Sequence, residues 1–370
     1  MKRLHKIALG NEKYPALTGV RAVGASVVFF DHFPLWPDAH IVINVMAFFY
    51  ALSGFLIVRI YYRQVEISGR WLSKYFLNRF ARIYPVYFLL LTLVVCFGHH
   101  HDPWLLLKNY TLTHALFEHT PLLIQPSWSL TVEECFYFLA PAFMLLTRRW
   151  GFALAFLAGG LLLAAALGVS TLPTDFLHSP LFVLSTTFFG HFVEFFAGVF
   201  LALVVMKLEE RKALRASGAR ATLAGVAGVV LLVGAMMLVY RHAPLNYTAI
   251  VLINNFLIPV PIAVLYAGLI RENTFLARLL SGRVAGLLGR SSYSFYLLHT
   301  IIIYHVSARL LAAAGHPALW SLVTFIVTWL ASIALFALFE EPVNLWIRRK
   351  FQSKDESLGM TQTLFPAGSR

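Results

Sequence analysis

The sequence has little charge, and acidic residues are the scarcer kind. Only 13% of its 370 residues are charged, with 17 Asp and Glu against 30 Lys and Arg. Soluble domains carry about 25% charged residues, so this composition excludes an ordinary soluble enzyme. Hydrophobic residues make up 59% of the chain, which indicates a multi-pass membrane protein. An excess of basic residues suggests nucleic-acid binding in a soluble protein; in this chain we expect no nucleic-acid partner.

Cysteine is almost absent, and so are a cleavable leader and a metal-binding motif. Cys96 and Cys135 both lie in apolar stretches and provide no disulfide framework. His99, His100 and His101 are consecutive, without chelating spacing, so the sequence predicts no metal site. Residues 1–14 are basic but no apolar segment with a small-residue cleavage site follows, and we expect a retained cytoplasmic tail.

Long apolar runs dominate the rest of the chain. A window of about 20 apolar residues marks a membrane-spanning helix. The sequence predicts about ten of them, at residues 15–33, 41–58, 83–98, 128–147, 150–168, 181–206, 222–240, 247–270, 292–311 and 318–340. Residues 103–117 are too short and polar a segment to span, and we expect them in the interface. The prediction is an all-α, polytopic transmembrane helix bundle over residues 15–347, with a disordered cytoplasmic tail at 348–370.

The distribution of positive residues supports this assignment. With both termini in the cytoplasm, 26 Lys and Arg residues fall on the inner side and three on the outer side, while Arg21 lies within the first span. Membrane proteins concentrate Lys and Arg in cytoplasmic loops. The chain is therefore expected in a plasma membrane, by analogy the inner membrane of a bacterium.

Two polar residues interrupt the first predicted span. Arg21 and His32 are eleven residues apart, which brings them to nearly the same face of a helix, roughly 16 Å apart along its axis. Ionisable residues inside a span face a bundle interior or a water-filled path and are functional candidates. Histidine is suited to general-base catalysis near neutral pH. A lone interfacial histidine is the alternative.

A pair of arginines opens the third predicted span, in the segment RFARIYP. Arg79 and Arg82 share one helix face at its cytoplasmic end. Two guanidinium groups at the start of a helix suit a phosphorylated cytosolic ligand. Topology determinants whose side chains reach the lipid headgroups are the alternative.

Further polar residues occur in the later spans. Glu133 and Glu134 in SWSLTVEECFYFLAP fall at a depth comparable to that of His32, where a carboxylate could orient the imidazole. Ser53 in FFYALSGFLI is either a nucleophile or, with Gly54, a point of close helix packing. Tyr293 and His299 occur in LLGRSSYSFYLLHT. The acids of FEEP, Glu340 and Glu341, could pair with inner arginines.

Together and in this order, the motifs resemble the integral-membrane acyltransferase family 3, whose members O-acetylate cell-surface polysaccharides. ALTGVRAVGASVVFFDHF is similar to that family's opening segment, although Thr18 replaces its usual Asp. The resemblance implies transfer of an acyl group from cytosolic acyl-CoA, usually acetyl-CoA, to a hydroxyl of a glycan or a lipid-linked saccharide.

The resemblance also implies roles for particular residues. His32 and Glu133 would be catalytic, with His32 as the general base. Arg79 and Arg82 would bind the phosphates of the donor, and Arg21 matches the family's first-span arginine. Beyond the resemblance, we expect Arg21 to contribute to donor binding and Ser53, Tyr293 and Glu134 to contact substrate. Either direct transfer or an acyl-enzyme on Ser53 or a tyrosine fits. A transporter or flippase for a glycan or a small polar solute is the alternative class.

Overall fold

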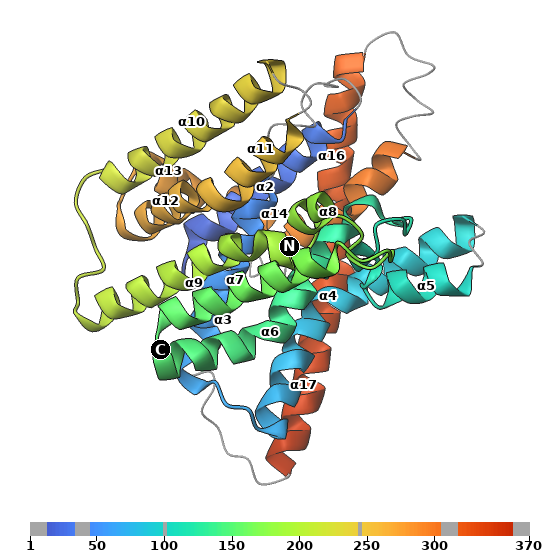
Figure 1. The fold of residues 1–370 in the computed structure, drawn as a ribbon. Helices are drawn as coiled ribbons and strands as arrows, with labels where there is room; N and C mark the ends of the chain where they lie inside the picture. Colours follow the sequence, from blue (N-terminus) through green and yellow to red (C-terminus); the bar gives the residue numbers. More distant parts are fainter. Residues whose placement is uncertain (1–12, 34–44, 99–101, 243–245, 305–316, 358–370) are drawn as a thin grey trace.

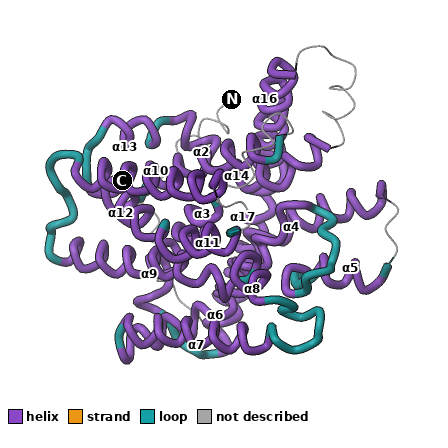
Figure 2. Tube along the Cα trace, turned by 45° about the horizontal axis from the view of Figure 1, so that its top comes forward, coloured by secondary structure: helices purple, strands orange, loops and turns teal. Residues whose placement is uncertain are grey.

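The computed structural model describes residues 13–33, 45–98, 102–242, 246–304 and 317–357, with side chains left undescribed at 317 and 352–357. Figure 2 shows helices joined by loops throughout this part of the chain. The first half comprises α2 (Pro15–Asp31), α3 (Met46–Tyr61), η2 (Tyr62–Gln64), α4 (Gly69–Gly98), α5 (Pro103–Tyr110), η3 (His114–Leu116), η4 (Gln125–Ser127), α6 (Trp128–Trp150) and α7 (Phe152–Val169). The second half comprises α8 (Pro180–Thr186), α9 (Phe188–Glu210), α10 (Arg220–His242), α11 (Tyr247–Leu252), η5 (Ile253–Leu257), α12 (Pro259–Arg271), α13 (Phe275–Leu280), α14 (Arg283–Ile302), α16 (Pro317–Leu335), η7 (Phe336–Glu340) and α17 (Glu341–Ser357).

Seven helical segments in the described residues are long and apolar enough to cross a membrane. They are Gly69–Gly98, Gln125–Trp150, Phe152–Val169, Pro180–Glu210, Arg220–His242, Tyr247–Arg271 and Ala318–Phe351. The predicted all-α membrane fold is confirmed. The count of ten spans and the cytoplasmic placement of both termini stay predictions.

Two of the other predicted spans correspond to α2 and α3, of 17 and 16 residues, and the one predicted at 292–311 overlaps only the second half of the 20-residue α14, which begins at Arg283. Residues 41–44 and 305–311 of these predicted spans lie outside the described part of the chain. These helices carry polar residues, such as Arg21, Ser53 and Ser292, because they pack against other helices (Figure 1). Helices buried in a bundle tolerate polar groups that lipid-facing helices do not.

Several boundaries differ from the predicted ones. The span predicted at 83–98 is the end of the 30-residue helix α4, which contains Pro85. The segment 103–117 forms the eight-residue α5 and the short η3, too short to cross a bilayer as expected. The last helix runs through the π-helical turn η7 to Ser357, so it continues into the tail predicted from residue 348.

Small residues bring the central helices close together. A Cβ atom at Gly54 would collide with the backbone of Phe195, and one at Gly198 would collide with the backbone of Ala51. Helices α3 and α9 are therefore in backbone contact, as the packing interpretation of Gly54 predicted. A similar collision at Gly289 would involve Thr18, so α14 is equally close to α2.

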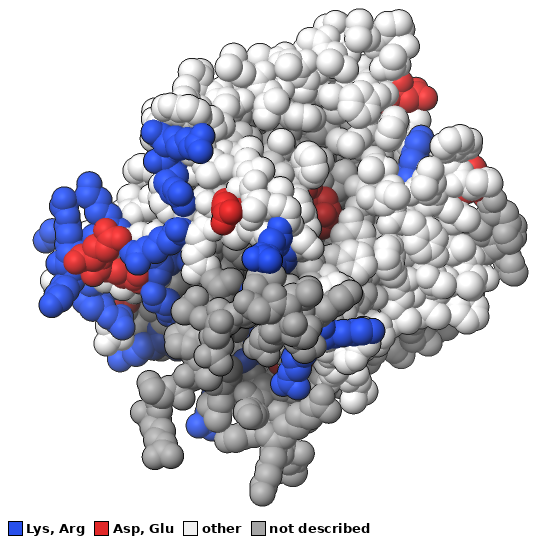
Figure 3. All heavy atoms as spheres, turned by 90° about the horizontal axis from the view of Figure 1, so that it is seen from below, with Lys and Arg blue, Asp and Glu red and all other residues white. Residues whose placement is uncertain are grey.

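Residues predicted on the inner side gather at one end of the bundle. Lys13 and Arg59 both form ion pairs with Glu209, and Arg63 pairs with Glu210. Figure 3 shows Lys and Arg side chains concentrated on this lower face, with acidic side chains among them at one edge. Three segments that are distant in sequence thus place their charges on the same side.

Candidate functional site

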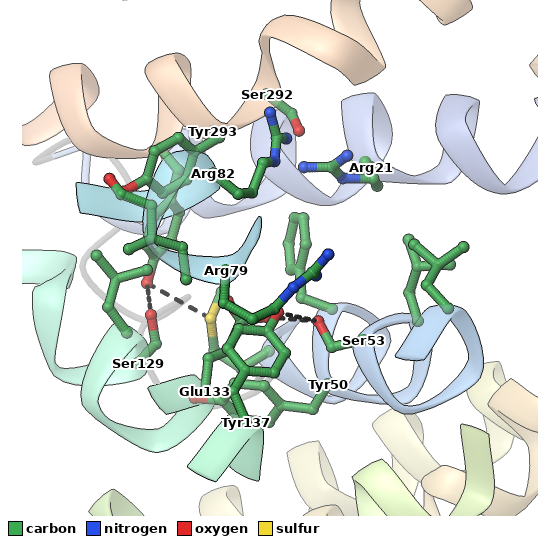
Figure 4. A pocket seen from close by; sticks show the side chains of 17 residues that line it. Arg21, Tyr50, Ser53, Arg79, Arg82, Ser129, Glu133, Tyr137, Ser292 and Tyr293 are labelled. Carbon is green, nitrogen blue, oxygen red and sulfur yellow. Dashed lines mark hydrogen bonds between the residues drawn. The ribbon is translucent and has the colours of Figure 1, made fainter. Parts of the chain in front are cut away.

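Five helices enclose a cavity of about 120 Å³ (Figure 4). They are α2, α3, α4, α6 and α14, and each contributes residues from one of the polar motifs. The lining residues are Arg21, Met46, Phe49, Tyr50, Leu52, Ser53, Leu56, Arg79, Arg82, Ile83, Ser129, Leu130, Glu133, Tyr137, Ser292, Tyr293 and Tyr296. Six of the eight predicted site residues therefore meet in one place, although they are spread over more than 270 positions of sequence.

Ser53 and Glu133 are hydrogen-bonded across the cavity. The Ser53 hydroxyl donates to Glu133 Oε1 at 2.6 Å and accepts from the Tyr137 hydroxyl at 3.3 Å. Helix α6 brings Glu133 and Tyr137 to the same face because they are one turn apart. A hydroxyl within hydrogen-bond reach of a carboxylate has the geometry of a nucleophile and its base.

Arg79 lies between two aromatic rings. Its guanidinium carbon is 5.7 Å from the ring centroid of Tyr61 and 5.5 Å from that of Tyr137. Its Nη2 is 3.5 Å from the Tyr61 hydroxyl, and its buried Nε has no hydrogen-bond partner in the described structure. Cation–π contacts of this kind orient a guanidinium without neutralising its charge.

Arg82 is engaged by an acid from the far end of the chain. It forms an ion pair with Glu340, which is only 2% exposed, and the other Glu340 oxygen accepts from the Ser294 hydroxyl at 2.6 Å. The expected pairing of a FEEP acid with an arginine is confirmed for Glu340 and Arg82. The ring of Tyr293 lies 5.6 Å from Arg82, and the Tyr293 hydroxyl donates to the carbonyl of Ile83. Arg82 and Tyr293 are thereby held in place at the cavity wall.

His32 lies at the end of α2 and is not among the lining residues. Its Nδ1 is 2.9 Å from the carbonyl of Val28, and its ring packs edge-on against that of His299, with centroids 5.1 Å apart. A carbonyl can only accept, so Nδ1 carries a hydrogen, and in the neutral ring the lone pair is on Nε2. The imidazole therefore has the tautomer of a base.

Glu133 and Glu134 do not contact His32 in the recorded geometry. Glu133 bonds to Ser53 instead. Glu134 does not line the cavity, and its buried Oε1 has no hydrogen-bond partner among the described residues. Orientation of His32 by Glu133 therefore has no support from a direct contact.

His299 is a candidate that sequence reasoning named without assigning a role. Its Nδ1 is 2.7 Å from the carbonyl of Tyr296, and its Nε2 is buried without a partner in the described structure. Tyr296 lines the cavity, and its hydroxyl is 2.6 Å from that of Ser129. The spacing of Ser292, Tyr296 and His299 along one helix face was the signal that could have connected the two histidines to the cavity.

A second buried polar cluster lies behind the cavity wall and was missed altogether. His191 and Glu194 on α9 are both fully buried, with Nδ1 and Oε1 3.0 Å apart, and Asn254 of η5 approaches Glu194. The ring of Tyr50, which lines the cavity, lies 5.3 Å from that of His191. The only sequence signal was a His and a Glu three residues apart in the apolar segment FFGHFVEFF.

Comparison with known proteins assigns the chain to a family. One curated relative, the peptidoglycan O-acetyltransferase OatA of Listeria monocytogenes serovar 1/2a, is 26% identical over 164 residues. That match covers 38% of this chain and 26% of the relative, so the chain spans only about a quarter of the relative's length. No solved structure matches. The model of the acyltransferase domain family matches residues 14–338, which is most of the chain and includes every lining residue of the cavity. The chain therefore belongs to this acyltransferase domain family.

Proposed function

We propose that the protein is a membrane-bound O-acyltransferase that uses cytosolic acyl-CoA, most simply acetyl-CoA. The acceptor is a hydroxyl of a cell-surface glycan or of its lipid-linked precursor, and the membrane is the bacterial inner membrane. One observation carries the proposal: five motif-bearing helices converge on a cavity that combines three arginines, a carboxylate and several hydroxyl groups. The name of the Listeria relative supports O-acetylation of a polysaccharide as the class of reaction.

The donor would be held by the arginines. Arg79, Arg82 and Arg21 give the cavity an excess of positive charge over its single acid, Glu133. Guanidinium groups bind phosphate oxygens through paired hydrogen bonds. A volume of about 120 Å³ is small beside the roughly 300–1,000 Å³ of typical ligand sites. The cavity therefore holds only part of the donor: its phosphates lie at the arginines, and the pantetheine arm with the thioester extends beyond the cavity toward the outer half of the bundle.

The chemistry moves one proton, from the acceptor hydroxyl to a base and from the base to the leaving group. The acceptor oxygen forms a bond to the acyl carbon, the carbon–sulfur bond breaks, and the hydroxyl proton passes through a base to the departing thiolate. His32, whose Nε2 carries a lone pair, is the proposed general base. Glu133 is the second candidate because it is the carboxylate in the cavity. Its bond to Ser53 also favours a two-step route through an acyl-serine as the alternative.

Binding of acetyl-CoA to the purified full-length protein tests the donor. We expect Arg79→Ala to raise the dissociation constant at least about tenfold, as loss of a charged hydrogen bond costs roughly 1.5–3 kcal/mol. Arg63→Ala is the matched control because Arg63 is an exposed arginine paired with Glu210 outside the cavity. Folded wild-type protein that binds neither acetyl-CoA, CoA nor succinyl-CoA would favour the transporter alternative.

Arg82 needs a different variant. Its removal leaves the buried carboxylate of Glu340 without a counter-ion, and breaking a buried pair costs about 3–5 kcal/mol. Weaker binding by Arg82→Ala alone would therefore reflect damage to the fold. The double variant Arg82→Ala/Glu340→Gln removes both charges, so a change in its affinity for acetyl-CoA measures the contribution of Arg82 to donor binding.

Turnover of acetyl-CoA with glycan acceptors tests the base. His32→Ala should lose turnover by roughly 10²–10⁴-fold, the usual contribution of general-base catalysis, while acetyl-CoA binding is kept. Full activity of His32→Ala, with Glu133→Gln inactive, would transfer the role to Glu133.

A further inference from the structure

Two loops that the charge pattern places on the outer side are joined by backbone contacts. The first connects α5 to α6 and the second connects α7 to α8. Phe117 and Phe176 form an antiparallel bridge, and the amide of Leu177 donates to the carbonyl of Leu116 at 3.0 Å. Leu177 is 2% exposed. The loops therefore hold a fixed position relative to each other.

Further hydrogen bonds order the first loop against α5 and join it to the second loop. Asn109 is fully buried, and its side-chain amide donates to the carbonyl of Pro121 while its oxygen accepts from the amide of Leu123. Ser179 donates to Glu118 across the two loops at 3.2 Å. Side chains carried by such ordered segments keep their mutual geometry.

Three metal-ligating side chains meet where these loops touch. His119 comes from the first loop, and Asp175 and His178 come from the second. One potential ligand atom from each lies within 4.8 Å of the other two. The imidazole rings have centroids 5.1 Å apart and are inclined at 62°. All three side chains are exposed, so an ion could reach them.

The spacing of these atoms fits an ion better than a direct contact. Asp175 forms no ion pair within 4.0 Å with His119 or His178, and all three residues belong to the described part of the chain. The centre of an equilateral triangle with a 4.8 Å side lies about 2.8 Å from each corner, and Zn–N and Zn–O bonds are about 2.0–2.2 Å. Side-chain rotations that move each ligand atom by about 0.6–0.8 Å close that gap.

The hydrogen bonding of His178 matches that of a metal ligand. Its Nδ1 lies 3.1 Å from the carbonyl of Thr174, which fixes the hydrogen on Nδ1 and leaves the Nε2 lone pair for coordination. Metal-ligating histidines usually donate their other ring N–H to a carbonyl or carboxylate in this way.

We propose that His119, Asp175 and His178 bind a divalent transition-metal ion, with Zn²⁺ as the best match. Two imidazoles and a carboxylate are a common ligand set for Zn²⁺, and water fills the remaining position. Imidazole ligands disfavour Mg²⁺ and Ca²⁺, which prefer oxygen. The ion links the two loops beside α8 and α5. This site is separate from the motif-lined cavity and does not depend on the proposed reaction.

Zn²⁺ titration of the full-length protein, after removal of any affinity tag and of bound metal, tests the site. The background variant carries His99→Gln, His100→Gln and His101→Gln, so that the neighbouring histidine run does not contribute. We expect one Zn²⁺ per chain. His119→Gln/His178→Gln should weaken binding at least about 100-fold, because loss of an outer-shell partner alone costs ~10–100-fold.

Controls separate the site from general damage. His242→Gln removes an exposed histidine at the end of α10 and should leave Zn²⁺ binding unchanged. If the double variant fails to fold, Asp175→Asn replaces it, with the expectation of at least tenfold weaker binding. Equal Zn²⁺ affinity in the variants and in the background protein would overturn the proposal. So would the absence of Zn²⁺ and Co²⁺ binding at 100 µM, because a dissociation constant of that size already corresponds to a binding free energy of only roughly 5 kcal/mol.

Discussion

Ser53 is the residue at which the two chemical routes separate. Its hydroxyl is hydrogen-bonded to the carboxylate of Glu133 and to the hydroxyl of Tyr137. In direct transfer it only positions Glu133, and in the two-step route it carries the acyl group. The two roles predict different losses of turnover when Ser53 is substituted.

We expect Ser53→Ala to retain turnover reduced roughly 10–100-fold, because a hydrogen bond to a charged group contributes about 1.5–3 kcal/mol. Steady-state turnover and mass spectrometry of protein mixed with acetyl-CoA measure this. Ser53→Thr, which keeps the hydroxyl, is the matched control. Complete loss in Ser53→Ala, together with an acyl group found on Ser53 of the wild type, would establish the acyl-enzyme route instead.

His114 is a buried histidine in the loop between α5 and α6, outside the spanning helices, and it should make stability depend on pH. Its Nε2 lies 3.1 Å from the Ser127 hydroxyl, which itself donates to the carbonyl of Ile124. Nδ1 is buried without a partner in the described structure. Burial lowers the pKa of His114 from 6.5 to about 4, because the charged imidazolium loses its contact with water in the folded protein.

A lowered pKa means that the unfolded chain binds the proton more readily than the folded one. The contribution to stability is therefore complete above pH 6.5 and falls as the pH decreases toward 4, by up to roughly 3 kcal/mol. Thermal unfolding at pH 7.5 and 5.0 measures it. His114→Gln should narrow the difference between the two midpoints, whereas His242→Gln should not. An unchanged difference in His114→Gln would contradict this assignment.

At the residue scale, the sequence predicted which residues belong to the site better than it predicted the contacts between them. Arg21, Ser53, Arg79, Arg82, Glu133 and Tyr293 all line one cavity. The sequence did not predict that Glu133 would bond to Ser53 or that His32 would pack on His299. Such pairings depend on how each helix is rotated against its neighbours, and motif spacing within a single helix does not contain that information.

At the element scale, contact between α3 and α9 positions Tyr50 and Ser53 in the cavity. Gly198 of α9 lies against the backbone carbonyl of Ala51, where no side chain can move aside. We expect Gly198→Ala to shift α3, with a cost of about 1–3 kcal/mol in stability and a loss of turnover. Unfolding midpoints and acetyl-CoA turnover measure both effects.

Gly160 in α7 is the matched control for this prediction. A Cβ added there meets nothing within 4 Å, and alanine is favoured over glycine inside a helix by about 1 kcal/mol. Gly160→Ala should therefore keep or raise stability. If Gly198→Ala behaves in the same way, the close packing of α3 and α9 does not control the site.

The elements themselves were predicted unevenly, for physical reasons. Lipid-facing helices such as α7 and α10 are almost wholly apolar and were found with nearly correct ends. Helix α4 begins at Gly69, well before its apolar part, because its first turns carry polar residues beyond the expected membrane region. The π-helical turn η7 interrupts a continuous helix at Glu340, and hydropathy contains no signal for such a turn.

At the scale of the whole molecule, the number of spans decides on which sides the termini lie. An odd number, such as the seven strongly apolar segments, would put them on opposite sides, and ten spans put both in the cytoplasm. Helices α2 and α3 have 17 and 16 residues and extend roughly 25 Å at 1.5 Å per residue. That is close to the hydrocarbon thickness of about 30 Å, so both helices can cross the membrane with a few flanking residues. The ion pairs at Glu209 and Glu210 are compatible with both counts, because four of the apolar segments lie between Arg63 and Glu209 and bring them to the same side in either case.

Labelling of single cysteines with a membrane-impermeant maleimide in intact cells distinguishes these topologies. In a background without Cys96 and Cys135, we expect Thr171→Cys to react from outside. Ser217→Cys, a cysteine at Lys2 and one added after Arg370 should react only after permeabilisation. The exposed positions Thr171 and Ser217 calibrate the two sides. Labelling of just one terminus from outside would require an odd number of spans.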